Sequence, residues 1–188
     1  MSRPLPRLLL LLGLALAVPA AATTVVHMDT RALARRSSDI VVGEVTGLRA
    51  YWNEAHTRIL TDVSVRVSES LKGAPASDLT LTQLGGELDG LRYDIPGGPS
   101  FAKGEEALLF VWRDAAGRPQ VNGLAQGKFE IGRDAASGAR LVQRSMPGLG
   151  IGDARTLRAA RPGEAPARVT LDTFKAEIRR ALAEEGVR

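Results

Sequence analysis

Within residues 57–71, β-branched side chains alternate with polar ones at a period of two. The β-branched residues of this segment occupy every second position: Ile59, Thr61, Val63, Val65 and Val67. A period of two predicts a β-strand with one buried and one solvated face. An apolar run begins before it at Ile40 and is interrupted by Gly43 and Gly47, which predicts a partner strand that bends at bulges. The polar, aromatic stretch 51–58 is then the turn that joins the two strands.

Downstream, the pattern predicts further strands separated by turns. Residues 79–84 form a third strand with Leu79 and Leu81 on its core face. Residues 107–112 are continuously apolar, which is typical of a strand buried on both faces. Between them, residues 87–103 carry glycines and prolines and predict a long irregular loop, either functional or a cover over a barrel end. Short strands are also expected at residues 120–124, 127–131 and 140–143.

Helical patterns flank the strands. Asp29 is a good N-cap for a short helix that runs to Arg36, with Leu33 as its inward anchor. Residues 145–168 show no periodicity and are interpreted as a flexible linker. The last segment has an apolar stripe at helical spacing, made of Leu171, Phe174, Ile178 and Leu182. Because its opposite face mixes both charge signs, we expect this helix to dock on the body instead of lying on a membrane.

The first residues have the pattern of a secretory signal peptide. Arg3 and Arg7 precede an apolar run over residues 8–18, and small residues follow at 20–22. The run is short for a bilayer span, so we expect cleavage after Ala22 and an exported protein, periplasmic or extracellular. The expected division is a signal peptide (1–22), a strand-rich domain with its N-terminal helix (23–144), a linker (145–168) and a docking helix (169–188).

The amino-acid composition limits the kinds of chemistry and of partner that we expect for the chain. The chain has no cysteine, which excludes disulfides, thiol catalysis and zinc–thiolate sites. Its 25 basic and 21 acidic side chains form no clustered basic run of the kind that predicts a nucleic-acid partner. We therefore expect no nucleic acid, no membrane contact after cleavage and no cofactor, while the oligomeric state stays open.

The order of elements suits an all-β fold with flanking helices, a five-stranded Greek-key barrel of the OB type. Several short motifs stand out within it: Ser38-Asp39-Ile40-Val41-Val42-Gly43, the alternation over residues 61–67, Leu71-Lys72-Gly73, and Gly104-Glu105 ahead of residues 108–110. Together they resemble the netrin-like domain, which is the OB-type fold of the tissue inhibitors of metalloproteinases, and small exported bacterial proteins with the same pattern. The resemblance covers residues 38–131 and implies a module that binds or inhibits a protein, such as an exported protease.

One departure limits what this resemblance implies. The animal inhibitors place the amine and carbonyl of a disulfide-tethered N-terminal cysteine on the protease zinc. This chain has no cysteine and would begin at Thr23 after cleavage. The zinc-chelating mechanism therefore does not carry over, and no inhibitory residue transfers by position.

The turn between the first two strands is the best binding candidate. OB-type barrels bind ligands with strands two and three and the flanking loops, and an aromatic platform beside polar donors is typical of recognition sites. The candidate residues are Tyr51, Trp52, Asn53, His56 and Arg58. Alternatively, Tyr51 and Trp52 fold back over the barrel end as a lid. The long loop adds Arg92 and Tyr93, and its segment 96–101 either cradles a ligand or lets Phe101 plug the barrel.

Catalytic patterns are missing from the sequence. There is no G-x-S-x-G elbow and no H-E-x-x-H, and the only imidazoles, His27 and His56, lie on different elements. We therefore expect no catalytic or metal-binding residue. The favoured function is a non-catalytic binding module, an inhibitor or accessory of a secreted metalloprotease. An envelope carbohydrate- or oligomer-binding barrel that uses the 51–58 turn is the first alternative, and a hydrolase with an unrecognised site is the second.

Overall fold

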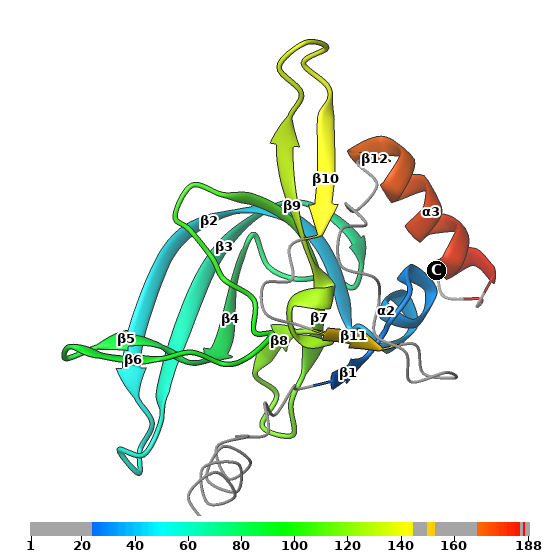
Figure 1. Ribbon diagram of the computed structural model, residues 1–188. Coiled ribbons are helices and arrows are strands. Elements are labelled where there is room, and N and C mark those ends of the chain that lie inside the picture. Colours follow the sequence, from blue (N-terminus) through cyan, green and yellow to red (C-terminus); the bar gives the residue numbers. More distant parts are fainter. Residues whose placement is uncertain (1–23, 145–149, 153–168, 185, 187–188) are drawn as a thin grey trace, which may run out of the picture.

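The computed structural model describes residues 24–144, 150–152, 169–184 and 186. This part of the chain is mostly β-strand, with one large antiparallel sheet and two α-helices (Figure 1). The helical elements are α2 (Thr30–Arg36), η1 (Leu124–Gly127, a 3-10 helix) and α3 (Leu171–Glu184). The longer strands are β2 (Asp39–Trp52), β3 (Ile59–Lys72), β4 (Asp78–Leu84), β7 (Glu106–Arg113), β9 (Lys128–Arg133) and β10 (Arg140–Arg144). The short strands are β1 (Thr24–Val26), β5 (Gly86–Leu88), β6 (Leu91–Tyr93), β8 (Pro119–Val121), β11 (Gly150–Gly152) and β12 (Val169–Thr170).

The large sheet has the order β12-β10-β9-β7-β2-β3-β4, and β8 pairs with β7. All of its pairs are antiparallel. The sheet arches strongly along β2 and β3 (Figure 1), which brings β4 close to β8. Among the described residues, however, no hydrogen-bonded ladder joins β4 to β8. The sheet is therefore a curved antiparallel sheet, and the closed five-stranded barrel is not shown.

The pairing of β2 with β3 is irregular at three points. The β2–β3 register shifts between Ile40 and Val41, between Val42 and Gly43, and again between Val45 and Gly47. Glycine at position 43 is required by close packing, because a Cβ there would lie 2.6 Å from the backbone oxygen of Arg66. The first two shifts leave Leu71 and Ser68 of β3 unpaired, whereas the third leaves Thr46 of β2 unpaired and moves the residues after it to the other face of β2. The glycine-marked bulges expected from the sequence are confirmed.

Two apolar clusters lie on opposite faces of the sheet. The inner cluster fills the concave face and consists of Val41, Val45, Val63, Val65, Leu79, Leu81, Ala107, Leu109, Val111 and Val121. The helix-side cluster joins the other face to both helices through Met28, Leu33, Ala34, Ile40, Val42, Leu108, Phe110, Phe129, Val142, Leu171, Phe174, Ile178, Ala181 and Leu182. β7 contributes to both clusters, which confirms the strand predicted from its continuous apolar run.

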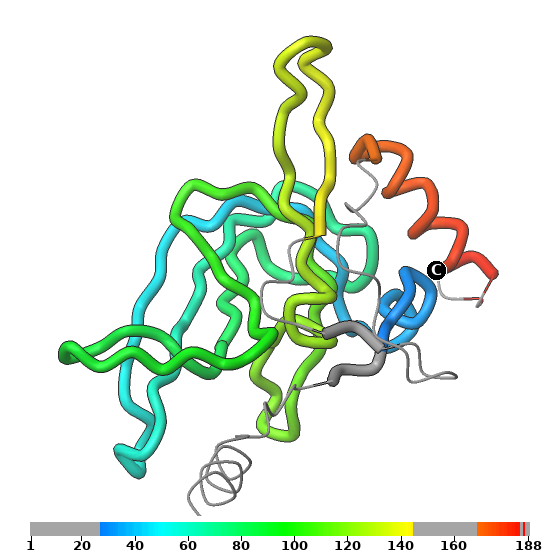
Figure 2. Tube along the Cα trace, viewed as in Figure 1, coloured from blue at the N-terminus to red at the C-terminus, as the bar shows by residue number. Residues whose placement is uncertain are grey.

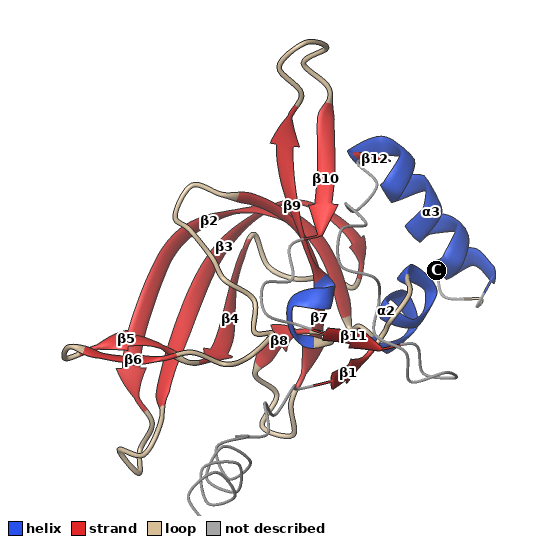
Figure 3. Cartoon of the chain, in the orientation of Figure 1, coloured by secondary structure: helices blue, strands red, loops and turns tan. Residues whose placement is uncertain are grey.

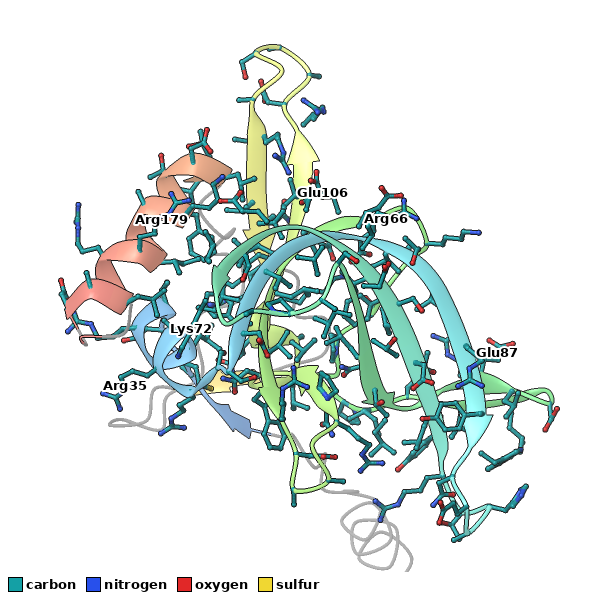
Figure 4. The ribbon with its side chains drawn as sticks, turned by 180° about the vertical axis from the view of Figure 1, so that it is seen from behind. Arg35, Arg66, Lys72, Glu87, Glu106 and Arg179 are labelled. Atoms are coloured by element: carbon teal, nitrogen blue, oxygen red, sulfur yellow. The ribbon has the colours of Figure 1, made fainter. Side chains whose placement is uncertain are left out.

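The helices are held by caps and ion pairs as well as by apolar contacts. The side chain of Asp29 accepts from the backbone N–H of Ala32 and caps α2, as its sequence predicted. On α3, Lys175 and Arg179 bind the two carboxylate oxygens of Glu69 on β3, at 2.8 and 3.0 Å. Figure 4 labels Arg179 on this helix. The predicted apolar stripe of α3 is buried throughout.

Two of the resemblance motifs meet where α2 joins the sheet. Lys72 reaches the C-terminal end of α2 and donates to the backbone oxygen of Ala34 at 2.7 Å (Figure 4). Gly73 has φ +76°, and a Cβ there would lie 2.3 Å from Oδ1 of the buried carboxylate of Asp39. Asp39 in turn pairs with Arg113 at 3.3 Å. In this structure Lys72 links β3 to α2, and Asp39 and Gly73 lie in close contact beside this link.

The structure also departs from the expected elements. Residues 87–93, expected to be part of an irregular loop, belong to the β5–β6 hairpin. The strand expected over 120–124 stops at Val121, and η1 follows from Leu124. The signal peptide expected at 1–22 and most of the linker expected at 145–168 lie outside the described residues. In the part that is described, no helix is long and apolar enough to span a bilayer.

Candidate functional site

The turn between β2 and β3 is built around the side chain of Asn53. Its Oδ1 accepts from the backbone N–H groups of Thr57 and Arg58, at 2.8 and 2.9 Å. The backbone N–H of Asn53 donates to the oxygen of Arg58 and closes the strands. An Asn that bonds the backbone ahead of it is a common organiser of turns. Of the predicted site residues, Asn53 thus shapes the turn, and Arg58 is exposed on it.

Trp52 connects this turn to a second hairpin. Its ring stacks on His56, with centroids 6.2 Å apart and an interplanar angle of 28°. Its indole N–H donates to the carboxylate of Asp89 at 3.0 Å. Asp89 lies at the tip of the β5–β6 hairpin, where it and Gly90 both have positive φ, as a tight two-residue turn requires. The two hairpin tips are therefore tied together, and Trp52 is partly occupied by that link.

Tyr51 belongs to the opposite face of the sheet. Its hydroxyl donates to Asp62 on β3 at 3.0 Å, and the guanidinium of Arg49 lies 5.1 Å from its ring centroid. Arg49 also pairs with Asp62 at 2.7 Å. Burial, and secondarily the hydrogen bond to Asp62, raises the pKa of Tyr51 above its ordinary value. This polar group braces the convex surface and does not share a cavity with Trp52.

A cleft of about 770 Å³ opens on the concave side of β2, β3 and β4. Its sheet wall includes Leu48, Thr61, Gln83 and Leu84, and its other wall is β6 together with residues 94–101. In Figure 2 the segment after β6 crosses in front of these three strands. The size falls within the usual range for ligand sites.

Several of the apolar side chains that line the cleft remain exposed to solvent. Leu48, Leu84 and Tyr93 line it and remain 45%, 40% and 40% exposed. They are three of the five exposed large hydrophobic residues in the described chain. A fourth, Leu91, lies on the adjoining strand β6. Contiguous exposed apolar surface of this kind marks interaction sites more often than chance scatter does.

Residues 94–101, which form one wall of the cleft, are held in place by contacts with η1 and β9. The backbone oxygen of Gly97 accepts from the N–H of Ala125 in η1 at 3.0 Å. Phe101 packs against the inner cluster, as the plug interpretation predicted, and Lys128 lies 4.8 Å from its ring centroid. Lys128 also donates to the backbone oxygen of Ser100. The cleft is thus preformed by packing and hydrogen bonds within the chain.

Lys128, which holds this wall of the cleft in place, is unusual for a lysine because its side chain is only 3% exposed. It forms ion pairs with Glu105 and with Glu130, the latter at 3.4 Å. Sequence reasoning missed this residue, because a single lysine at the start of a strand gives no sign of burial. A buried ammonium with paired carboxylates holds position well, since leaving either charge alone is costly.

The polar side chains of the cleft come from β4 and from the β5–β6 hairpin. Arg92 pairs with Asp94 at 2.8 Å and with Glu87 at 3.9 Å. Figure 4 labels Glu87 at the end of the arch remote from α2. Gln83 lines the cleft, and its buried Nε2 has no hydrogen-bond partner among the described residues. Arg92 and Tyr93, both predicted from the sequence, therefore belong to the cleft, whereas Tyr51 does not.

The possible metal ligands of the described residues are dispersed. No group of three or more His, Asp or Glu side chains lies close enough there to hold a metal ion. His27 and His56 are both exposed. No protein-family model matches the chain, and no curated protein matches it either. The cleft and the linked hairpin tips are the features on which a function can be argued.

Proposed function

We propose that this protein is an exported, non-catalytic binding module with a netrin-like, OB-type barrel whose rim binds a protein partner. The observation that carries the proposal is the concentration of Leu48, Leu84 and Tyr93 in one preformed cleft. Buried aromatic and aliphatic anchors supply most of the energy of protein interfaces, and a rigid site avoids the entropic cost of ordering. The cleft lies at the rim of the arch, beside two linked hairpin tips.

The barrel assignment is supported by the arrangement of the strands. β2, β3 and β4 are consecutive antiparallel neighbours, β7 returns to pair with β2, and β8 approaches β4. The inner cluster lies within this curve, as the interior of a small barrel would. Two of the resemblance motifs, those that contain Asp39 and Lys72-Gly73, occupy the joint between α2 and the sheet. Export is proposed from the signal-peptide pattern of residues 1–22.

The partner class follows by analogy with the tissue inhibitors of metalloproteinases, so an exported protease is the first partner to test. Fold analogy is a weaker argument than a site, and the absence of cysteine rules out their zinc-chelating terminus. The glycan alternative loses its main support, because Trp52 is already stacked on His56 and bonded to Asp89. A metal-dependent hydrolase has no cluster of His, Asp or Glu ligands to support it among the described residues.

The experiment is capture of partners from culture supernatant and periplasmic extract, using residues 23–188 immobilised through a C-terminal tag, followed by mass spectrometry. Tyr93→Asp should abolish recovery of the partner, because it places a charge in the cleft. Trp112→Asp is the matched control, since Trp112 is 37% exposed and does not line the cleft. Partner proteases should lose activity when the wild-type chain is added. Failure to enrich any protein over Tyr93→Asp would refute the proposal.

A further inference from the structure

The cleft combines an apolar lining with a donor that lacks a partner. Gln83 pairs across the ladder with Thr61, whose hydroxyl donates to the backbone oxygen of Gly85 at 2.7 Å. The amide Nε2 of Gln83 makes no hydrogen bond within the described chain and is closed off from solvent, so a ligand reaches it only when the side chain turns toward the cleft. A buried amide N–H left unsatisfied is costly, so a bound acceptor would recover that cost. The carbonyl oxygen of a peptide backbone is such an acceptor.

The mouth of the cleft is acidic. The β5–β6 hairpin and its exit carry Glu87, Asp89 and Asp94 against one cation, Arg92. Arg92 is shared between Glu87 and Asp94, and Asp89 accepts only the neutral indole of Trp52. Negative charge is therefore in excess at this edge. A ligand segment with lysine or arginine beside its apolar residue complements that charge.

The shape of the site favours a chain over a small molecule. Pockets for small ligands bury 70–90% or more of the ligand surface, as a general rule. Here the apolar lining keeps 40–45% exposure at Leu48, Leu84 and Tyr93, so the site is an open groove. An extended polypeptide can place one side chain in such a groove while the rest of it contacts the rim.

We propose that the cleft binds an extended segment of the partner protein. An apolar side chain of that segment packs against Leu48 and Leu84, a backbone carbonyl accepts from Nε2 of Gln83, and an adjacent Lys or Arg faces Glu87 and Asp94. This inference rests on the proposed function and adds the chemistry of the recognised segment. Under this proposal the Gln83 amide contributes to specificity, a role that the sequence did not indicate.

The probe is a phage-displayed library of random 12-residue peptides, selected on residues 23–188. Enriched peptides should share an apolar residue with Lys or Arg one or two positions away. Their affinity, measured by fluorescence anisotropy, should fall about tenfold or more in Leu48→Asp and in Leu84→Asp. Trp112→Asp is the control of the same chemistry, since Trp112 is 37% exposed, lies on β7 and does not line the cleft, and its affinity should stay within about twofold. Raising NaCl from 0.15 to 0.5 M should weaken binding about threefold.

A second variant separates recognition from folding. Gln83→Met keeps the volume of the side chain but removes the unsatisfied donor. We expect its Tm to rise by about 2–4 °C while peptide affinity falls about fivefold. A purely structural role for Gln83 predicts no loss of affinity. Opposite signs for stability and binding would support the proposal, whereas unchanged affinity would overturn the role of the amide.

The outcomes distinguish this inference from the proposed function. If partner capture succeeds but selected peptides bind Leu84→Asp and wild type equally, the rim function stands and the cleft inference is wrong. If enriched peptides lack basic residues, or affinity is insensitive to salt, the acidic mouth has no part in recognition and the inference is also wrong. If a saturating fatty acid displaces the peptides, the groove is a lipid site. If capture returns no protein, the proposed function itself fails.

Discussion

β2 runs through two different environments along its length. Near α2 and α3, β2 is buried at every position from Asp39 to Val45 except Glu44, with apolar clusters on both faces. Beyond residue 45, no residue of β2 is buried. Figure 3 shows both helices at one end of the arch and the β5–β6 hairpin at the other. β2 thus has an end packed for stability and an end left open, whereas β3 does not follow this division, because Ile59 at its open end is buried.

β2 therefore contributes to stability at one end and is available for binding at the other. At the packed end, side chains contact neighbours on both faces, so substitutions there should cost stability. At the open end, Leu48 and Leu84 keep much of their surface in water, so trimming them should cost binding and little stability. Gly47 marks the change, because the register shift beside it turns Leu48 toward the concave face.

The largest effect is expected from Phe110→Ala at the packed end. Phe110 is fully buried, and its ring lies 5.8 Å from that of Phe129 and 6.4 Å from that of Phe174. Truncation leaves a large cavity and should lower the free energy of unfolding by about 3–5 kcal/mol. Urea denaturation followed by circular dichroism measures it. Leu84→Ala is the comparison at the open end and should cost less than about 1 kcal/mol.

Equal losses of stability in Phe110→Ala and Leu84→Ala would contradict the difference between the packed end and the open end. So would a large loss for Leu84→Ala alone, since it would place Leu84 in the folding core. The same pair should show the reverse order in peptide binding.

Lys128→Met tests the link between the packed interior and the open cleft. Removing the ammonium leaves the carboxylate of Glu105 without its partner and frees the backbone oxygen of Ser100. We expect a loss of about 2–4 kcal/mol in stability. The double variant Lys128→Met/Glu105→Gln should recover about half of it, because the carboxylate then left without the ammonium is that of Glu130, which is 44% exposed. An additive double variant would show that the two side chains are not coupled.

Gly73→Ala probes the joint between α2 and β3. Position 73 combines φ +76° with a Cβ that would approach Asp39 to 2.3 Å, so the substitution should cost about 2–3 kcal/mol. Gly117 has nearly the same φ, +77°, and open space around it. Gly117→Ala therefore measures the backbone strain alone, about 1 kcal/mol, in the same thermal-unfolding assay. If both variants lose the same stability, the contact with Asp39 is of no consequence.

Sequence patterns predicted much of the packed end. Period-two alternation identified β3, and the stripe of α3 matched its residues because helical spacing is strict. The open end was harder to predict. Asp89-Gly90 is a strong signal for a two-residue hairpin, yet the surrounding glycines and prolines obscured β5 and β6. Barrel closure depends on how far the sheet curls, which alternation does not encode.

The candidate site was predicted only in part. Arg92 and Tyr93 do line the cleft, and Trp52 does lie at its rim hairpins. Leu48 was missed because a bulge reverses the faces of β2, and a sequence does not show on which side of a glycine the register shifts. The partnerless amide of Gln83 depends on the positions of distant groups. Sequence spacing carries no information about those positions.

The smallest effect should come from Tyr51→Phe, on the convex face of the open end. The hydroxyl of Tyr51 donates to Asp62, so its loss should cost about 0.5–1 kcal/mol at neutral pH. Burial and Asp62 raise the pKa of Tyr51 above 10.0, so the unfolded chain releases this proton first. Its contribution is therefore complete below pH 10 and declines as pH rises through the higher pKa of the folded state.

The wild type should consequently lose more stability than Tyr51→Phe between pH 9 and 11, in urea titrations at each pH. Taking the difference between the two proteins cancels the other titrating groups. Peptide binding should be the same in both, because Tyr51 faces away from the cleft. A binding defect in Tyr51→Phe would mean that the convex face takes part in recognition, and the contrast between the two faces of the open end would have to be abandoned.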